Sequence, residues 1–486
     1  MITAFVDMVG LLMVIPLLPF YAERMGGGGL WVGILVSAFS LAQLVSAPLW
    51  GRVSDRYGRR PALLVGLGAA AIAYVIFAHA ESLWILLASR LVQGAGGGTV
   101  GVIQAYVADS TEPKDRAKSL GWLSAATNAG VAIGPVLGSA SLQFGPRSPG
   151  LLAAGLCVVN MIFAWAFLHE SLAAVKPGET RAAPRRSREV VLDVLTHPGE
   201  AAPRLIWIYA IGMGAFTGFT SILALFLARH FGFTEHTVGW VFMWNGTLSV
   251  IARALVLGRM VDWLGEARLA RVGQTVLGVG LLLMPLTWRL GGGTTVNPPG
   301  GGWSGSLDLR IVAAVVAALL IAGLLRLARL MEPGERLRLM GIMGGIVAAA
   351  LAWVLWHDPD PAVIAIPDRF GLQYRYLALA AVLTLMPLGT AFTFPCVTAL
   401  LSHVIDPRER GVVMGVQQSY GGVARVMAPI ASGWAWDALG TSYPFWGSAT
   451  LVLATLFLTF GIDRDRTRAS RAAPAPAPSP AAADGG

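Results

Sequence analysis

The chain has 486 residues, of which 55% are hydrophobic and 13% are charged. A soluble globular domain carries about 25% charged residues, so this composition excludes a water-soluble enzyme. The formal net charge is +9, but a membrane protein gathers surplus Lys and Arg in its cytoplasmic loops, so nucleic acid is not an expected partner. The composition predicts an all-α polytopic membrane protein.

Apolar blocks recur along the whole chain at roughly 20 residues each, the length that crosses about 30 Å of hydrocarbon as a helix. Fourteen such spans are predicted, and their even number puts both termini on one side of the membrane. The spans lie near 2–21, 30–50, 61–80, 83–108, 118–142, 149–169, 204–228, 234–258, 268–290, 311–330, 338–356, 375–401, 411–436 and 443–462.

Positive charge is unevenly divided between the two sides. Of the 36 Lys and Arg residues, 26 fall on the side of the N-terminus, seven on the other side and three within spans. We therefore expect both termini in the cytoplasm, in a protein of the bacterial inner membrane. The first span shows no cleavage-like site, so no separate signal peptide is expected. Because that span begins beside Met1, we expect the natural start to lie further upstream.

A polar stretch divides the chain into two halves. Residues 1–169 are predicted to form one six-helix bundle, 170–203 a cytoplasmic linker and 204–462 a second six-helix bundle. Within the second half, 311–356 is predicted to be an inserted two-helix hairpin, because it has no counterpart in the first half. The tail, 463–486, alternates Pro and Ala and is expected to be disordered.

The loops of the two halves also contain similar sequence patterns. The pattern Gly-x-x-x-Asp-x-x-Gly occurs at 51–58 and again at 258–265, and Glu-Pro-Lys-Asp-Arg at 112–116 corresponds to Asp-Pro-Arg-Glu-Arg at 406–410. Two repeated patterns at corresponding positions of the two halves predict that the bundles arose by duplication. Parallel repeats of this kind hold a substrate site between them near the membrane midplane, with alternating access by rocking.

Longer motifs follow the second span and lie in the first, fourth and fifth spans. They are Gly51-x-x-x-Asp55-Arg56-x-Gly58-Arg59-Arg60, Asp7-Met-Val-Gly10, Arg90-Leu-Val-Gln93-Gly94 and Gly130-x-x-x-Gly134-Pro135-x-x-Gly138. Nearly the whole chain, apart from the hairpin and tail, resembles the major facilitator superfamily, and within it the drug:proton antiporters of the tetracycline-resistance type. This resemblance implies a secondary transporter that works with protons and without a cofactor.

The loop after the second span is predicted to be a conformational latch. In it, Asp55 can accept hydrogen bonds from backbone donors at a helix end, and Arg59 can pair with Asp109 at the end of the fourth span. Such a latch would favour the outward-facing state and release in the inward-facing one. A plainer interpretation is that these arginines only enforce the orientation of the chain. The predicted latch residues are Gly51, Asp55, Arg56, Gly58, Arg59, Arg60 and Asp109.

The fifth span carries a stripe of glycines at four-residue spacing. Gly130, Gly134 and Gly138 share one helix face, where a neighbouring helix can approach closely, and Pro135 adds a bend. The resemblance implies that this face packs against the eighth span. Packing is the main role expected for it, with prevention of proton leak as an alternative.

Asp7 is the candidate proton carrier, because it alone of the 27 acidic residues lies clearly inside a predicted span. A charge there costs about 2.5–3.5 kcal/mol on insertion scales, so an acid in this position is a functional candidate. If the chain starts at Met1, Asp7 could instead be a solvated helix-end residue. Arg90 is expected about 10 Å away along the membrane normal, too far for a static ion pair. It is expected instead to line the cavity, to tune Asp7 at a distance or through water, or to bond backbone carbonyls.

The substrate cavity is predicted to be apolar with a few polar anchors. Arg425, in the middle of its span, is either an anion contact or a structural residue. Tetracycline exporters carry further acids and a His that align with Ala73, Leu277 and Ser249, so a chelated-metal tetracycline site is not expected. The predicted cavity residues are Gln104, Asn128, Phe216, Phe219, Trp244, Asn245, Phe392 and Arg425.

Three classes of function remain in competition. The leading hypothesis is proton-coupled export of a small amphipathic organic compound, and the alternative is a proton-coupled importer or symporter of a small solute that can be anionic. An enzyme is not expected, because no span carries a catalytic set of residues and no phosphate-binding loop is present. We expect no cofactor and no metal site, and a monomer whose partners are a small-molecule substrate, protons and the bilayer.

Overall fold

The computed structural model is all-helical over the residues that it describes. The chain divides into two compact units, Met1–Pro285 with Ala380–Gly486, and Leu286–Leu379. The contacts discussed below lie within the first unit. The structure describes residues 1–97, 99–112, 115–171, 187–288, 374–406 and 409–459.

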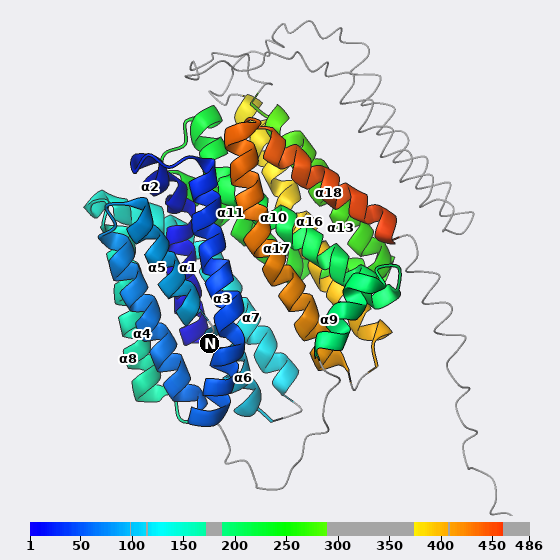
Figure 1. Ribbon diagram of the computed structural model, residues 1–486, viewed down its shortest axis with the longest axis horizontal. Helices are drawn as coiled ribbons and strands as arrows, with labels where there is room; N and C mark the ends of the chain where they lie inside the picture. The colour runs from blue at the N-terminus through cyan, green and yellow to red at the C-terminus, as the bar shows by residue number, and fades with distance from the viewer. Residues whose placement is uncertain (98, 113–114, 172–186, 289–373, 407–408, 460–486) are drawn as a thin grey trace, which may run out of the picture. The chain divides into compact units, whose positions relative to one another are not determined.

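In the described part of the first half, the first and fourth predicted spans are each broken into shorter helices (Figure 1). The first span bends through a 3-10 turn at Ile15–Leu17, because Pro16 and Pro19 lack the amide protons that a straight helix needs. The helices are α1 (Ile2–Val14), α2 (Leu18–Arg24), α3 (Gly29–Tyr57), α4 (Arg59–Ala78), α5 (Leu83–Gly96), α6 (Thr99–Asp109), α7 (Arg116–Ser141) and α8 (Ser148–Phe167).

The second half follows the same plan over its described part. Its eighth span contains a π-helical segment, Ala252–Val256, between two α-helices. The helices are α9 (Ser187–Thr196), α10 (Ala201–Phe231), α11 (Val238–Ile251), α12 (Leu257–Leu264), α13 (Glu266–Leu283), α16 (Tyr374–Val404), α17 (Arg410–Ala438) and α18 (Tyr443–Thr459).

Within the described part of the chain, nine helices are long and apolar enough to span a membrane, and α18 is a shorter apolar helix. The predicted hairpin 311–356 and tail 463–486 lie outside the described residues. The count of fourteen spans therefore stays a prediction.

The predicted fourth span, 83–108, is not continuous. Helix α5 ends at Gly96 and α6 begins at Thr99. Glycines near this break allow close packing: a Cβ on Gly94 would lie 2.3 Å from the carbonyl oxygen of Phe39, and one on Gly96 would lie 2.9 Å from Cβ of Ala69. The same residues that bring α5 against its neighbours have low helix propensity, which accounts for the break.

The predicted linker 170–203 is not wholly unstructured, because it contains α9. Val190 and Val194 of this helix are buried against the second half. Trp207 donates its indole N–H to the carbonyl of Val194 at 3.2 Å, and the Tyr420 hydroxyl donates to the carbonyl of Val191 at 3.0 Å. The sequence analysis missed this helix because one short buried stripe is a weak pattern within a polar segment.

The most extensive contacts between the halves are those of α3 with α17, which lie side by side in Figure 1, and of α7 with α11. We call the end of the bundle at Tyr57, Asp109 and Arg410 the basic end, and the end at Gly29 and Ala438 the opposite end. Closely packed glycines line the α3–α17 contact towards the opposite end. A Cβ on Gly433 would lie 2.1 Å from the Gly29 carbonyl oxygen.

The fifth-span glycines pack against a different helix from the one expected. Model Cβ atoms on Gly130, Gly134 and Gly138 would meet the backbone of α1, not the eighth span. The eighth span contacts another face of α7, where its own Gly239 and Gly246 approach closely. Two separate faces of α7 thus require close approach, since α7 lies between α1 and α11.

Candidate functional site

A cavity of about 650 Å³ lies between the two halves. This volume is typical of a site for a drug-sized molecule. Of the predicted cavity residues, only Arg425 lines it, while Asp55 and Arg59 of the predicted latch also contribute. The lining comes from α3, α4, α6, α17 and the residue between α5 and α6: Ser40, Gln43, Leu44, Ala47, Pro48, Gly51, Ser54, Asp55, Arg59, Gly97, Val100, Gly101, Val102, Ala105, Gln418, Ser419, Gly422 and Arg425.

Arg425 differs from the other charged groups of the lining. Asp55 and Arg59 pair with each other at 2.7 Å. Arg425 has no hydrogen bond or ion pair to any residue that the structure describes, and it is partly buried. Among the described residues of its lining, the cavity therefore presents one unpartnered cation from the second half.

Asp7 lies partly buried in the middle of α1. It accepts a hydrogen bond from the Thr99 hydroxyl at 3.2 Å, with Thr99 at the first position of α6. Asp7 and Arg90 make no ion pair within the described residues. The sequence analysis did not identify Thr99, because nothing in a local pattern indicates which helix packs beside α1.

Arg90 is almost completely buried and takes part in a hydrogen-bonded network. It donates to the Gln93 side chain, and Gln93 donates to the Tyr74 hydroxyl at 2.5 Å. Its guanidinium carbon also lies 5.0 Å from the ring centre of Phe39. Tyr74 in turn lies beside α1, where a Cβ on Gly10 would be 3.5 Å from the Tyr74 hydroxyl. The network thus links Arg90 to the face of α1 one turn after Asp7.

At the basic end, Arg59 connects α3, α4 and α6. Its Nε donates to Asp109 at 2.9 Å, and its NH1 contacts Asp55 at 2.7 Å and the Ser54 hydroxyl at 2.8 Å. All these groups belong to the first half. The predicted Arg59–Asp109 pair is present, and because it lies within one half, separation of the halves does not by itself require it to break. Its release in the inward-facing state stays a prediction.

A residue that the sequence analysis missed supplies the backbone contacts assigned to Asp55. Glu170 accepts from the amides of Arg59 and Arg60 at 2.8 and 3.1 Å and so caps α4. Gly58 makes this possible: its φ is +103°, and a Cβ there would lie 2.4 Å from a carboxylate oxygen of Glu170. Glu170 is distant in sequence, so its capping role has no local signal.

The remaining latch residues lie on the two helices that meet at Gly58, with Gly51 and Arg56 on α3 and Arg60 on α4. Arg60 donates to the carbonyl of Trp165, and the guanidinium of Arg56 lies 5.4 Å from the ring centre of Tyr57. Gly51 lines the cavity. These contacts again stay within the first half.

The opposite end is sealed by polar contacts between the halves. Asp437, near the end of α17, accepts from the amides of Gly29 and Leu30 at the start of α3, both at 2.8 Å. Arg24 pairs with Glu235 across the same end. The Ser37 hydroxyl donates to the carbonyl of Val426 at 2.6 Å. We call this set of contacts, together with the glycines of α3 and α17, the opposite-end seam.

The other predicted cavity residues lie elsewhere. Asn128 and Asn245 donate to carbonyls of their own helices, at 2.8 and 3.3 Å. The Trp244 indole donates to the Thr384 hydroxyl at 3.3 Å, and Gln104 is exposed on α6.

Three predicted cavity aromatics pack inside the second half. Phe219 lies 6.0 Å from Phe445 between ring centres, and Phe216 and Phe392 belong to an apolar cluster around α10 and α16. Aromatic character alone does not indicate whether a ring faces a cavity or the core.

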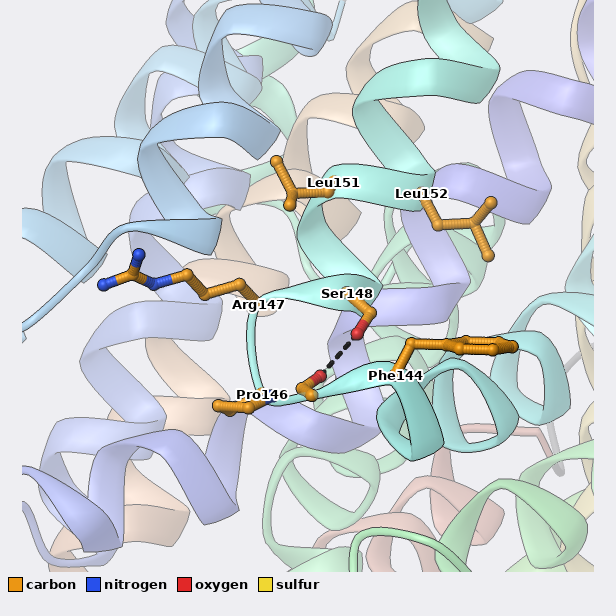
Figure 2. A pocket seen from close by; sticks show the side chains of 7 residues that line it. Phe144, Pro146, Arg147, Ser148, Leu151 and Leu152 are labelled. Carbon is orange, nitrogen blue, oxygen red and sulfur yellow. Dashed lines mark hydrogen bonds between the residues drawn. The ribbon is translucent and has the colours of Figure 1, made fainter.

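A second hollow, of about 790 Å³, lies at the turn between α7 and α8. Figure 2 shows that Phe144, Arg147 and Leu151 come from this one turn, where the Ser148 hydroxyl donates to the Gly145 carbonyl at 2.5 Å. All its lining residues fall within 144–152. Residues of both halves line the first cavity, whereas all the residues that line this hollow belong to the first half.

Comparison with known proteins decides the family. The model of the Major Facilitator Superfamily matches residues 1–296 and 370–483, most of the chain. The chain belongs to this superfamily. It is therefore an integral membrane transporter, and the resemblance inferred from its motifs is confirmed.

The relatives from this superfamily include drug-resistance proteins. The chain is 29% identical to Multidrug resistance protein 2 of Bacillus subtilis over 55% of this chain and 67% of that one. It is 33% identical to the class G tetracycline resistance protein of Vibrio anguillarum, over 57% and 71% of the two chains. These relatives support the drug:proton antiporter branch.

Solved structures of the superfamily share the fold. The human organic anion transporter MFSD10 (TETRAN) aligns with a TM-score of 0.57 and 22% identity, covering 94% of this chain and 97% of that one. The nucleoside transporter NupG aligns with a TM-score of 0.63 and 11% identity, covering 95% and 98%. At these identities the similarity establishes the fold and not the substrate.

Proposed function

We propose that the protein exports a small amphipathic organic compound in exchange for protons. The observation that carries this proposal is the placement of Asp7, a carboxyl group partly buried in an apolar helix and held by Thr99. A carboxyl group in such a position can take up and release a proton as its exposure changes. The drug-resistance relatives support export as the direction.

The proposed cycle is alternating access between two six-helix bundles. The sealed opposite end and the cavity that reaches the basic end support a state open at the basic end. With both termini and the linker 170–203 in the cytoplasm, as the Lys and Arg distribution predicts, this state faces inward. The hairpin 311–356 completes a topology of fourteen spans, the tail 463–486 stays cytoplasmic, and the transporter works as a monomer in the bacterial inner membrane.

The proposal assigns a separate role to each group of residues. Asp7 carries the proton, and Arg90 tunes it through Gln93 and Tyr74. Arg59 and Asp109 hold the basic end of the first half together, and Gly130, Gly134 and Gly138 let α7 pack on α1. Arg425 lines the substrate cavity.

The test is a transport assay on the full chain in proteoliposomes with an imposed proton gradient. A fluorescent dye is followed for wild type, Asp7→Asn, and the matched control Asp193→Asn on the exposed linker helix. We expect Asp7→Asn to lower gradient-driven accumulation at least tenfold, since it cannot exchange a proton, while the control keeps the wild-type rate. An Asp7→Asn variant that pumps with unchanged proton dependence would falsify the assignment.

An importer of a small anionic solute is the second candidate, and the unpartnered Arg425 favours it. The same proteoliposomes separate the two directions. A proton gradient that stimulates uptake of solute together with protons supports the importer, whereas movement of solute against the proton flow supports the exporter.

A further inference from the structure

We propose that the central cavity selects organic anions and that Arg425 binds the anionic group of the substrate. This inference deepens the proposed function and rests on it, because it names the chemical class of compound that the transporter carries. The ligand is an amphipathic molecule with a carboxylate or sulfonate at one end.

The first argument is the contrast between Arg425, in the second half, and two arginines of the first half, Arg90 and Arg59. Removing a guanidinium from bulk water is unfavourable unless hydrogen bonds or opposite charge replace the water. Arg90 has Gln93 and the Phe39 ring, and Arg59 has Asp55 and Asp109. Arg425 is partly buried with no such partner among the residues that the structure describes. An anionic ligand would supply the missing partner.

The second argument is the charge of the lining as a whole. The only carboxylate among the lining residues is Asp55, and it is already paired with Arg59 at 2.7 Å. No free carboxylate is therefore available within this lining to bind a cationic drug. A cation in the cavity would face Arg425 without compensation, which disfavours that class of substrate.

The third argument concerns the other polar and apolar groups that line the cavity with Arg425. Ser419 donates its hydroxyl proton to the Gly415 carbonyl at 3.0 Å, and Gln43 donates to the Gly97 carbonyl at 3.0 Å. The Ser419 hydroxyl proton is used within the protein and the Gln43 amide keeps one N–H, but of these three side chains only Arg425 carries a positive charge, so it is the strongest of the three as a donor to an anion. Leu44 and Val100 also line the cavity and provide apolar surface for an organic body.

Arg425 also lies where the seam meets the cavity. The next residue, Val426, accepts the hydrogen bond from Ser37 that joins the halves. One turn further along α17, Pro429 contacts α3: a Cβ on Gly33 would lie 2.2 Å from its carbonyl oxygen. An anion on Arg425 would thus bind at the inner edge of the contacts that must separate when the opposite end opens.

Equilibrium binding to the purified full chain in nanodiscs tests the inference. The probes are dansylglycine, dansylamide and dansylcholine, which carry the same fluorescent ring with a carboxylate, no charge and a quaternary ammonium. We expect dansylglycine to bind wild type at least tenfold more tightly than dansylamide, the difference that one charge-assisted hydrogen bond provides. Dansylcholine should bind most weakly. Tighter binding of dansylcholine than of dansylglycine overturns the proposal.

Variants at Arg425 link this preference to the residue. Arg425→Gln should remove the preference for dansylglycine over dansylamide, and Arg425→Lys should retain at least a third of it. Arg259→Gln, an exposed residue of α12 with the same change of charge, is the matched control and should bind as wild type does. An unchanged preference in a folded Arg425→Gln protein rejects the assignment. If Arg425→Gln fails to fold, the order of affinities for the three probes in wild type and the preference measured in Arg425→Lys still test whether the cavity selects anions.

The binding assay is independent of the transport assay with Asp7→Asn. It needs no gradient, so a failure of proton coupling leaves the ligand preference measurable. Conversely, a proton-driven pump that prefers dansylcholine would keep the proposed export function and refute only the anionic class.

Discussion

The interface between α3 and α17 differs greatly between its two ends. At the opposite end, Gly29, Gly33 and Gly433 bring the helices into backbone contact, and Asp437 caps the start of α3. At the basic end, the same two helices separate around the cavity. The difference shows that one pair of helices can seal and open at different depths, with glycines in backbone contact at the sealed end.

The mechanism of closure also differs between the ends. The polar contacts of the opposite-end seam cross between the halves, whereas the Arg59 contacts at the basic end stay within the first half. Only contacts of the first kind have to break when the halves rock apart. Variants in the two regions should therefore have different consequences.

The largest expected effect comes from filling the seam. In Gly33→Leu, the new side chain meets the Pro429 carbonyl, since even a Cβ would lie 2.2 Å from it. We expect at least a tenfold loss of gradient-driven transport, because overpacking of this kind costs about 1–3 kcal/mol and disfavours the sealed state. The rate of dye accumulation in proteoliposomes measures it.

The matched control for this substitution is Gly155→Leu on α8, where nothing lies within 4 Å of the added Cβ. This control should transport at the wild-type rate. If both variants lost transport activity equally, a Leu side chain in any span would be harmful by its bulk. The loss could then not be attributed to the opposite-end seam.

A smaller effect is expected from removing the cap on α3. Asp437→Ala leaves the amides of Gly29 and Leu30 without their acceptor, at a cost of about 0.5–2 kcal/mol to the sealed state. The labelling rate of a Ser37→Cys reporter by a membrane-impermeant maleimide should rise about five- to tenfold. Cys157 and Cys396 are buried, so background labelling is low.

Asp437→Asn refines the same experiment, because its amide oxygen can still accept one of the two hydrogen bonds. Its labelling rate should fall between those of wild type and Asp437→Ala. A rate for Asp437→Ala equal to wild type would mean that the glycine contacts alone hold the seam closed.

The smallest effect is expected at the basic end. The Arg59–Asp109 pair is partly exposed, so its loss should lower the free energy of unfolding by only about 0.2–1 kcal/mol. Arg59→Gln, Asp109→Asn and the double variant form a cycle in which the two single effects are not additive. Thermal unfolding in detergent measures the stability of each variant.

The same three variants test whether the Arg59–Asp109 pair affects the opposite-end seam. Because the pair lies within one half, the Ser37→Cys reporter should label at the wild-type rate in all of them. A rise in labelling rate similar to that expected for Asp437→Ala would instead indicate that Arg59 helps to control the separation of the halves.

Much of the architecture was predictable because hydropathy and charge are local properties. Blocks of about 20 apolar residues predicted the described spans, and the motifs around Asp55 and Arg90 predicted the superfamily. The break between Gly96 and Thr99 and the helix α9 were missed. The glycines at the break are a local signal that a count of apolar residues does not register, whereas the burial of α9 depends on packing against residues remote in sequence, which local patterns do not record.

The candidate site was less predictable than the fold. Arg425 could be singled out because a charge within an apolar span is conspicuous. Thr99, Glu170 and Asp437 could not, because each acts on a helix remote in sequence. The predicted aromatic residues show the same limit, since Phe219 is buried against Phe445 and does not line the cavity.

The sequence by itself determined that this chain is a membrane-embedded bundle of helices and which family of transporters it belongs to, because the requirement for apolar spans leaves a strong periodic record. Only the tertiary structure decided that the glycines of α7 face α1, that Asp437 seals α3 and that Arg425 faces a cavity without a partner among the described residues. These facts depend on which helices are neighbours, and helix packing in lipid is selected by shape and hydrogen bonding between residues far apart in the chain.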